Sequence, residues 1–231
     1  MMKAMIFAAG RGERMAELTR ATPKPLLKVA GKPLIDYTVR RLQQAGIREM
    51  VINVAYLGEQ IQQYLGDGSR LGVAIVYSRE PYPLETGGAI GHALELLGEA
   101  PFVVVNADIW TDYPFEKLLN HQFDAGKLGH LVMVPNPSQL PTGDFYLNEA
   151  LLLQPERDNV ARDSFTYSGI ALLHPRLVAE YSRRREKFPL VEAFREAMQD
   201  QRLSGEVYRG QWRDIGTPER LRQLQQEVTG R

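Results

Sequence analysis

The sequence predicts an α/β fold, with a mostly parallel β-sheet and helices on both of its faces. Short, continuously apolar runs alternate with amphipathic segments through the first 135 residues. This alternation is typical of strand–helix–strand crossovers, in which parallel strands are buried on both faces. After residue 135, proline, asparagine and aspartate surround shorter strand-like pieces. We therefore expect one domain over 1–231, made of a core (1–135), a smaller α/β lobe (136–210) and a C-terminal segment (211–231).

The expected core strands are short apolar runs bounded by turn residues. They are AMIFAA, EMVINVA, VAIVYS and PFVVVNAD, at residues 4–9, 49–55, 73–78 and 101–108. The segments between them carry apolar residues at helical spacing and end at glycine; these expected helices are 33–46, 58–68 and 87–98. In such sheets, ligands bind beyond the carboxyl ends of the strands.

The later elements are less regular. SFTYSGIALLHP (164–175) is typical of a buried strand, and PLVEAFREAMQD (189–200) of an amphipathic helix. Residues 204–216 resemble a pair of strands. A final helix is expected to follow, with Thr217 as its N-cap and Pro218 at its first position.

The composition is that of a soluble globular protein without bulk charge. Lys+Arg and Asp+Glu balance at 28 each, so we expect no nucleic acid partner. The absence of cysteine excludes disulfides and thiolate metal sites. No stretch reaches the roughly 20 apolar residues of a membrane span, and no signal h-region is evident. We expect a cytoplasmic protein without a membrane partner, and a monomer because no large exposed apolar helix is evident.

The loop after the first apolar run concentrates cationic and backbone-donor groups. AAGRGERMAELTRATPKP (8–25) contains two glycines, three arginines and a lysine. It is not a P-loop, and Met15 replaces the third glycine of a dinucleotide-binding motif. Gly10 and Gly12 can still turn backbone N–H groups onto a phosphate chain. A solvated basic connection is the alternative, and the prolines that flank Lys24 argue against it.

A second polar cluster follows the most apolar run. Asp108 lies just after that run, in NADIW, and Asp214 lies far along the chain in WRDIGTP. Two carboxylates from distant segments commonly hold Mg²⁺ while leaving positions for phosphate oxygens. Taken alone, Asp108 is also compatible with a helix cap or turn residue. The histidines show no ligand spacing and are interpreted as structural or surface residues (His92, His121, His130 and His174).

Together these segments resemble the signature of the nucleoside-diphosphate-sugar pyrophosphorylases, nucleotidyltransferases that join a sugar 1-phosphate to a nucleoside triphosphate. The resemblance is carried by AAGRGERMAELTRATPKPLLKVAGKPLI and continues through LETGGAI, VVVNADIW and WRDIGTPERL. It implies a Rossmann-like core of the nucleotide-diphospho-sugar transferase type with a sugar-binding lobe, magnesium dependence and binding of the nucleotide first. Residues 1–135 would be the nucleotide-binding core, 136–210 the sugar-binding lobe, and 211–231 the segment with the second metal aspartate.

The resemblance also assigns roles to residues. Arg14 and Lys24 are expected to be catalytic, and Asp108 and Asp214 to bind Mg²⁺. The expected nucleotide-binding residues are Ala9, Gly10, Arg11, Gly12, Glu80, Glu85, Thr86, Gly87 and Asn106.

The segment PLETGG is expected to bind the base. Uracil has an N3–H donor between two carbonyl acceptors, so its site needs an acceptor between donors. Backbone groups at Thr86 and Gly87 are candidate donors, and the carboxylate of Glu80 or Glu85 is a candidate acceptor. Thymine would fit this pattern as well, and a glycine-rich helix entry is an equally open interpretation.

Two acidic residues of the lobe are expected to bind the sugar. Asp144 in TGDF and Glu156 in QPERD would accept hydrogen bonds from its hydroxyl groups. Relatives with a Glu-Lys-Pro motif place a lysine on the sugar phosphate, and PERD has no such lysine. Lys187 and Arg195 are candidate replacements, and the departure leaves the identity of the sugar more open than the reaction.

The resemblance implies transfer of a uridylyl group from UTP to a sugar 1-phosphate, N-acetylmuramic acid 1-phosphate above all, in bacterial cell-wall recycling. A phosphomonoester is largely dianionic at neutral pH, so no general base is needed. Alternatives of the same class are a glucose or mannose 1-phosphate nucleotidyltransferase and a phosphocholine cytidylyltransferase. An inactive nucleotide-sensing relative is the alternative of another class, and the presence of both basic residues and both aspartates argues against it.

Overall fold

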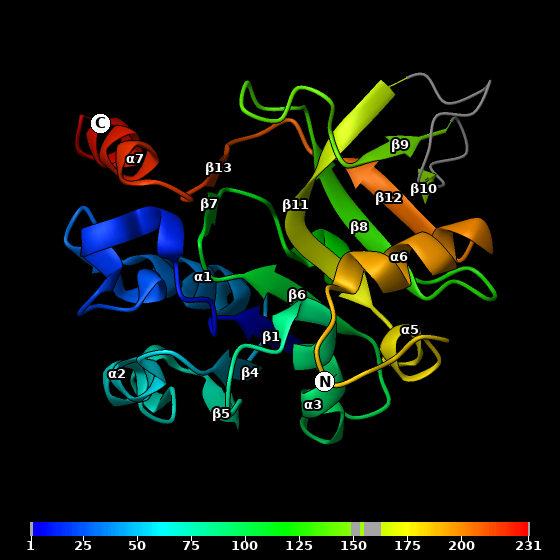
Figure 1. The fold of residues 1–231 in the computed structure, drawn as a ribbon, viewed down its shortest axis with the longest axis horizontal. Coiled ribbons are helices and arrows are strands. Elements are labelled where there is room, and N and C mark those ends of the chain that lie inside the picture. The colour runs from blue at the N-terminus through cyan, green and yellow to red at the C-terminus, as the bar shows by residue number, and fades with distance from the viewer. Residues whose placement is uncertain (1, 149–152, 155–162, 231) are drawn as a thin grey trace.

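One large sheet runs through the molecule. The computed structural model describes residues 2–148, 153–154 and 163–230. The main sheet has the order β10-β9-β11-β6-β1-β4-β5, with β8 beside β11 and β12 beside β8 (Figure 1). Its strands are β1 (Lys3–Phe7), β4 (Glu49–Val54), β5 (Ala74–Arg79), β6 (Phe102–Asn106), β8 (Gly129–Val134), β9 (Phe145–Leu147), β10 (Leu153–Gln154), β11 (Asp163–Leu173) and β12 (Leu203–Val207).

The core half of the sheet is parallel, as the sequence predicts. Strand β1 pairs in parallel with β4 and β6, and β4 with β5. Successive side chains of a strand point to opposite faces, so Met5 packs in one apolar cluster and Ile6 in the other. Both are fully buried. This is why the strands are continuously apolar rather than alternating.

Helices cover both faces of the sheet. The cluster around Met5 includes side chains of α3 (Glu85–Leu97), α5 (Arg176–Ala179) and α6 (Leu190–Gln199). The cluster around Ile6 includes side chains of α1 (Leu34–Gln44), α2 (Gly58–Leu65) and α4 (Glu116–Leu119). The helices expected at 33–46, 58–68 and 87–98 therefore lie where the sequence places them, within a few residues.

The second half of the chain extends the same sheet with antiparallel strands. Strand β11 pairs antiparallel with β6 on one side and with β8 on the other. Strand β8, GHLVMV, is fully buried and was not among the expected strands. The expected strand pair at 204–216 is wrong in its pairing: β12 pairs with β8, and β13 (Trp212–Asp214) pairs with β7 (Ile109–Thr111).

A third apolar cluster anchors the loop at 8–25. Short 3-10 helices η1 (Glu13–Thr19) and η2 (Lys24–Leu26) lie in this loop, the hairpin β2 (Lys28–Val29) and β3 (Lys32–Pro33) follows it, and η3 (Ser69–Leu71) lies after α2. Met15 is fully buried with Ile215 and Leu224, the latter on the final helix α7 (Pro218–Thr229). Thr217 caps α7 by accepting a hydrogen bond from the Arg220 N–H, as expected. The C-terminal helix thus packs on the loop that follows β1.

Candidate active site

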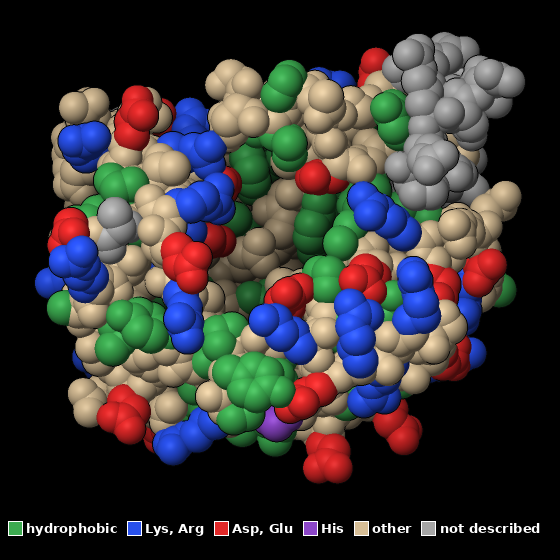
Figure 2. Space-filling model, viewed as in Figure 1, with side chains coloured by type: hydrophobic (Ala, Val, Ile, Leu, Met, Phe, Trp, Pro, Cys, Tyr) green, Lys and Arg blue, Asp and Glu red, His purple; other side chains and the backbone are tan. Residues whose placement is uncertain are grey.

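A cavity of about 880 Å³ opens where β1 and β6 end. Figure 2 shows a hollow in the face of the molecule, with Lys, Arg, Asp and Glu side chains around it. The cavity is lined by Phe7, Ala8, Ala9, Gly10, Arg11, Gly12, Glu13, Arg14, Lys24, Pro25, Asn53, Glu80, Tyr82, Pro83, Glu85, Thr86, Asn106, Ala107, Asp108, Lys187 and Gly216. Of the expected site residues, it brings together those of the loop after β1, Glu80, Glu85, Thr86, Asn106 and Asp108, whereas Gly87 and Asp214 are not in its lining.

The two glycines of the loop differ in what surrounds them. Gly12 has φ +65°, and a Cβ built on it would lie 3.0 Å from a Thr19 carbon and 3.2 Å from the Lys24 Cβ. A Cβ on Gly10 would meet no atom within 4 Å, and its φ is not positive. The fold therefore requires glycine at position 12 but not at 10. Gly10 leaves open space at the cavity wall, where a ligand can approach the backbone closely.

Lys24 and Asp108 form an ion pair in the cavity. The lysine is 8% exposed, and its ammonium group contacts the Asp108 carboxylate. Pro25 at the start of η2 and Pro23 before it fix the backbone on both sides of this lysine. The pairing with Asp108 means that the buried ammonium group of Lys24 is not left without a counter-charge before it contacts a phosphate oxygen.

The small sheet of β7 and β13 brings the two aspartates together. Asp214 is the register partner of Ile109, and the Ile215 N–H donates to the Asp108 carbonyl at 2.9 Å. The described residues contain no cluster of three or more His, Asp or Glu side chains arranged to hold a metal. A cation at Asp108 and Asp214 would accordingly take its remaining ligands from phosphate oxygens and water, which suits Mg²⁺.

Arginines gather beside Asp214. The Arg220 Nη1 donates to the Asp214 Oδ2 at 2.5 Å. A Cβ on Gly216 would lie 3.1 Å from that Oδ2 and 3.2 Å from the Arg14 Nη2. Arg14 itself is exposed and lines the cavity. Gly216 and Arg220 were not singled out from the sequence, although both lie within the quoted WRDIGTPERL.

Glu80 has a supporting place in the cavity wall. Its Oε1 accepts from the Asn53 side chain at 2.8 Å and its Oε2 accepts from the Leu84 N–H at 2.9 Å. Asn53 in turn accepts from the Ala8 N–H at 2.8 Å. Burial raises the pKa of Glu80, and the hydrogen bonds from Asn53 and Leu84 act in the opposite direction. The carboxylate thus ties the loop after β1 to the base-binding segment.

The glycines of PLETGG serve packing. The Gly87 N–H donates to the Phe188 carbonyl at 3.0 Å, and a Cβ on Gly87 would lie 2.3 Å from the Phe188 ring. Gly87 does not line the cavity, so the expectation that its N–H binds the base is not supported by the geometry. Glu85 and Thr86 do line it, and Glu85 has φ +61° at the start of α3.

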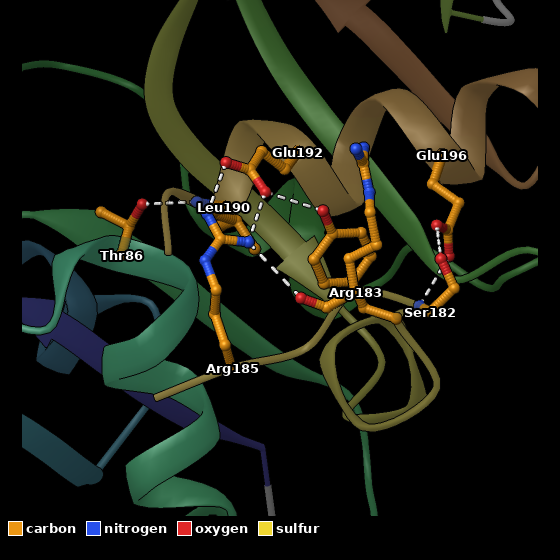
Figure 3. A network of polar contacts seen from close by, with 8 residues as sticks. Thr86, Ser182, Arg183, Arg185, Leu190, Glu192 and Glu196 are labelled. Carbon is orange, nitrogen blue, oxygen red and sulfur yellow. Dashed lines mark hydrogen bonds and ion pairs between the residues drawn. The ribbon is translucent and has the colours of Figure 1, made fainter. Parts of the chain in front are cut away.

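A polar network fixes the segment opposite α3. Arg185 contacts both carboxylate oxygens of Glu192 at 2.8 Å, and Tyr181 donates to the same carboxylate (Figure 3). Thr86 accepts from the Leu190 N–H at 3.0 Å, which joins α3 to α6. This segment carries Lys187 to the cavity, whereas Arg195 is exposed on α6 and does not line it.

The expected sugar-binding residues lie away from the lining of this cavity. Asp144 is exposed, and its Oδ2 accepts from the Tyr167 N–H at 2.8 Å. Asn136, which was not singled out, donates to the Ser164 carbonyl at 3.1 Å and so holds the loop before Asp144 against β11. Glu156 lies outside the described residues. Asn106 lines the cavity, and Gly169 of β11 passes so close that a Cβ there would lie 2.6 Å from the Asn106 amide nitrogen.

The histidines lie outside the cavity lining, as expected for structural residues. The ring of His130 is buried, its Nδ1 lies 2.8 Å from the Ser204 hydroxyl, and the His121 ring packs on it. Burial lowers the pKa of His130 to about 4, with a smaller contribution from His121. In the described part of the chain, no helix is long and apolar enough to span a membrane.

The fold agrees with what is found in known proteins. The chain belongs to the nucleotidyl transferase family, whose sequence model matches residues 3–145. A chain from Bacillus anthracis, solved with bound sucrose, has the same fold, with a TM-score of 0.84 at 20% identity over 99% of this chain and 95% of that one. The resemblance to nucleotidyltransferases is confirmed, as is the fold class that it implied.

The chain is also similar to particular sugar-1-phosphate nucleotidyltransferases. It is 45% identical over 227 residues to the N-acetylmuramate alpha-1-phosphate uridylyltransferase of Neisseria meningitidis, covering 97% of each chain. It is 31% identical to a mannose-1-phosphate guanylyltransferase catalytic subunit beta of Drosophila melanogaster, of which it spans 60%. These similarities show an enzyme of this class, whose substrates are a nucleoside triphosphate and a sugar 1-phosphate.

Proposed function

We propose that the chain transfers a uridylyl group from UTP to N-acetylmuramic acid 1-phosphate, giving the UDP-sugar and pyrophosphate. The observation that carries the proposal is the wall of the cavity after β1. There an unhindered glycine, exposed arginines and a lysine–aspartate pair face one space large enough for a nucleotide. The similarity to the Neisseria meningitidis uridylyltransferase over nearly the full chain supports the choice of substrates.

The chemistry asked of the protein is positioning and neutralisation of charge. An oxygen of the sugar phosphate forms a bond to the α-phosphorus of UTP, and the bond from that phosphorus to the β-phosphate bridging oxygen breaks. Pyrophosphate leaves with the electron pair of that bond, and no proton has to be removed from the nucleophile. Arg14 and Lys24 line the cavity, and we assign them to the negative charge on the phosphates in the transition state.

Mg²⁺ would be held by Asp108 and Asp214, which the β7–β13 pairing brings together. When bound, the ion would offset the charge of the triphosphate and the leaving pyrophosphate. The backbone at Gly10 and Gly12 would follow the phosphate chain, with Ala9 and Arg11 beside it. Asn106 would contact the ribose or the α-phosphate from the end of β6.

The base would lie against the segment that precedes α3. Both carboxylate oxygens of Glu80 already accept a hydrogen bond, so Glu85 is the better candidate to accept the uracil N3–H. Tyr82 lines the same region with 44% of its surface exposed, which leaves its ring available for stacking on a base. Thr86, in the first turn of α3, would contact the base through its backbone groups.

The sugar would be bound from the lobe, with Asp144 and Glu156 on its hydroxyl groups. N-acetylmuramic acid carries a carboxylate that glucose and mannose lack, so its site needs a cation or backbone donors. Lys187 is exposed and lines the cavity, and in the described part of the chain no ion pair of its side chain is found. We therefore favour Lys187 over Arg195 as the cation that contacts the acidic sugar substrate.

A pyrophosphate-release assay tests this proposal, with UTP, dTTP, CTP, GTP and ATP crossed against N-acetylmuramic acid, N-acetylglucosamine, glucose and mannose 1-phosphates in the presence of Mg²⁺. We expect UTP with N-acetylmuramic acid 1-phosphate to give the highest kcat/KM, with dTTP about tenfold lower because of one methyl group. A higher value for glucose 1-phosphate with dTTP, or for mannose 1-phosphate with GTP, would contradict the assignment of substrates. We further propose a cytoplasmic monomer, which light scattering of the purified chain would check.

A further inference from the structure

Both aspartates proposed to bind the metal already have a cationic partner within the chain. Asp108 is paired with Lys24, and Asp214 with Arg220. The Arg220 Nη1 lies 2.5 Å from the Asp214 Oδ2 and 3.5 Å from the carbonyl oxygen of the same residue. Each carboxylate is thus paired with a cation of the same chain.

The Arg220 pair is built into the start of α7. Thr217 accepts from the Arg220 N–H at 3.3 Å, and Pro218 occupies the first turn. The side chains of Arg220 and Asp214 are 23% and 27% exposed. An ion pair so shielded from water is stronger than one on the open surface.

Two arginines line the same cavity, together with Glu13, Glu80 and Glu85. Arg11 and Arg14 are exposed, line the cavity and have no ion pair with any described residue. Two neutralised carboxylates next to two unpaired arginines attract a triphosphate and give little attraction to a free divalent cation. When phosphate oxygens compete for Lys24, the Asp108 carboxylate becomes available to a cation.

We propose that Lys24 and Arg220 keep the two aspartates neutralised until a triphosphate binds, so that the divalent cation enters with the triphosphate and not before it. Arg220 is then a positioning residue, which sets the metal affinity of Asp214 without touching the substrates. This inference rests on the proposed assignment of the metal to Asp108 and Asp214.

Mn²⁺ is a suitable probe, since electron paramagnetic resonance reports its free concentration directly. With the full chain, we expect weak Mn²⁺ binding alone, and with UTP or inorganic triphosphate we expect more bound Mn²⁺ than the same triphosphate binds without protein. Arg220→Met and Lys24→Met should each strengthen binding without nucleotide by about tenfold, since each removes a cation that competes for a carboxylate. Arg220→Lys keeps the charge and should behave as the wild type.

Arg213→Met is the matched control. It removes an exposed arginine next to Asp214 that pairs instead with Glu227 at 3.2 Å, and it should leave Mn²⁺ binding unchanged. Adding Asp214→Asn to Arg220→Met should cancel the gain, and a gain that persists would overturn the proposal. It is also overturned if the wild type binds Mn²⁺ equally well without triphosphate, or if Arg220→Met has no effect. The nucleotide-free measurement involves no substrate, so an error in the proposed UTP or sugar specificity leaves this result unaffected.

Discussion

Side chains of the loop at 8–25 divide into those that hold the loop and those that face the ligand. Met15 is fully buried against α7, and the φ of +65° at Gly12 suits glycine. Arg11 and Arg14 instead extend into the cavity from exposed positions. Both kinds of residue lie in one short segment of the sequence, and only the burial of their side chains in the structure distinguishes them. Substitutions at the second kind should therefore change activity while leaving the fold intact.

Replacing Arg14 with alanine tests this division. We expect turnover at saturating UTP to fall by about a hundredfold, the scale of losing one preorganised donor to a transition-state charge. The melting temperature should stay unchanged, because the Arg14 side chain is exposed. Arg20→Ala is the control, since Arg20 belongs to the same loop and pairs with Glu17 away from the cavity. Equal activity of the two variants would remove Arg14 from the mechanism.

The two aspartates are tested by amide substitution. Asp108→Asn and Asp214→Asn keep the shape and one oxygen but lose the charge that offsets a metal, so each should abolish Mg²⁺-dependent activity. EDTA should silence the wild-type enzyme, and added Mg²⁺ should restore it. Steady-state assays across a Mg²⁺ titration measure both effects. Full activity of the wild type in EDTA would exclude the metal role of both residues.

His130 makes stability depend on pH. The pKa of His130 in the folded protein is about 4, below the value of about 6.5 expected in the unfolded chain. The unfolded chain therefore binds the extra proton first, and stability is lost as pH falls from about 6.5 to 4. The groups facing His130 are the His121 ring and the Ser204 hydroxyl. The free energy of unfolding should fall between these two pH values by up to about 3 kcal/mol less in His130→Gln than in the wild type. Urea unfolding at both pH values measures this difference. His92→Gln, at an exposed position, should leave the dependence unchanged.

At the scale of elements, the loop after β1 and the entry of α3 use glycine for different reasons. Gly10→Ala adds a methyl group that meets no protein atom within 4 Å, so the melting temperature should hold while KM for UTP rises about tenfold. Gly87→Ala places its Cβ 2.3 Å from the Phe188 ring, which should destabilise the fold by roughly 1–3 kcal/mol. Thermal melting and steady-state kinetics on both variants separate the two effects. A stable Gly87→Ala variant with a raised KM would instead return Gly87 to the base site.

The core elements were predictable from the sequence because their signals are local. Continuously apolar strands and the helices between them follow from the repeat of buried positions, and Thr217 with Pro218 marks the start of α7. The pairing of β12 and β13 was not predictable, since each joins a strand far away in the chain. Likewise the partner of Lys24 is decided by the β6–β7 turn, which brings in Asp108. Arg220 went unnoticed because a charged residue in the first turn of a helix is usually solvent-exposed.

At the scale of the whole molecule, the lobe is joined to the core by the sheet itself. Strand β11 pairs with β6 of the core along one edge and with β8 along the other, and its first residues also pair with β9. Strand β6 leads into Asp108, so the cavity lies where the parallel and antiparallel halves meet. The sequence predicts that the regular alternation of strands and helices ends near residue 136. The sequence does not show that the strands on either side of that position pair in one sheet.

The turnover of Lys24→Ala is the most direct measurement of what the cavity does. Lys24 joins the loop after β1 to Asp108 and is nearly buried, so it connects the phosphate-binding and metal-binding parts of the proposed site. With saturating UTP, N-acetylmuramic acid 1-phosphate and Mg²⁺, we expect kcat to fall by about a hundredfold or more, with circular dichroism and melting showing a folded protein. A folded Lys24→Ala enzyme that retains wild-type kcat would contradict the assignment of this cavity to nucleotidyl transfer.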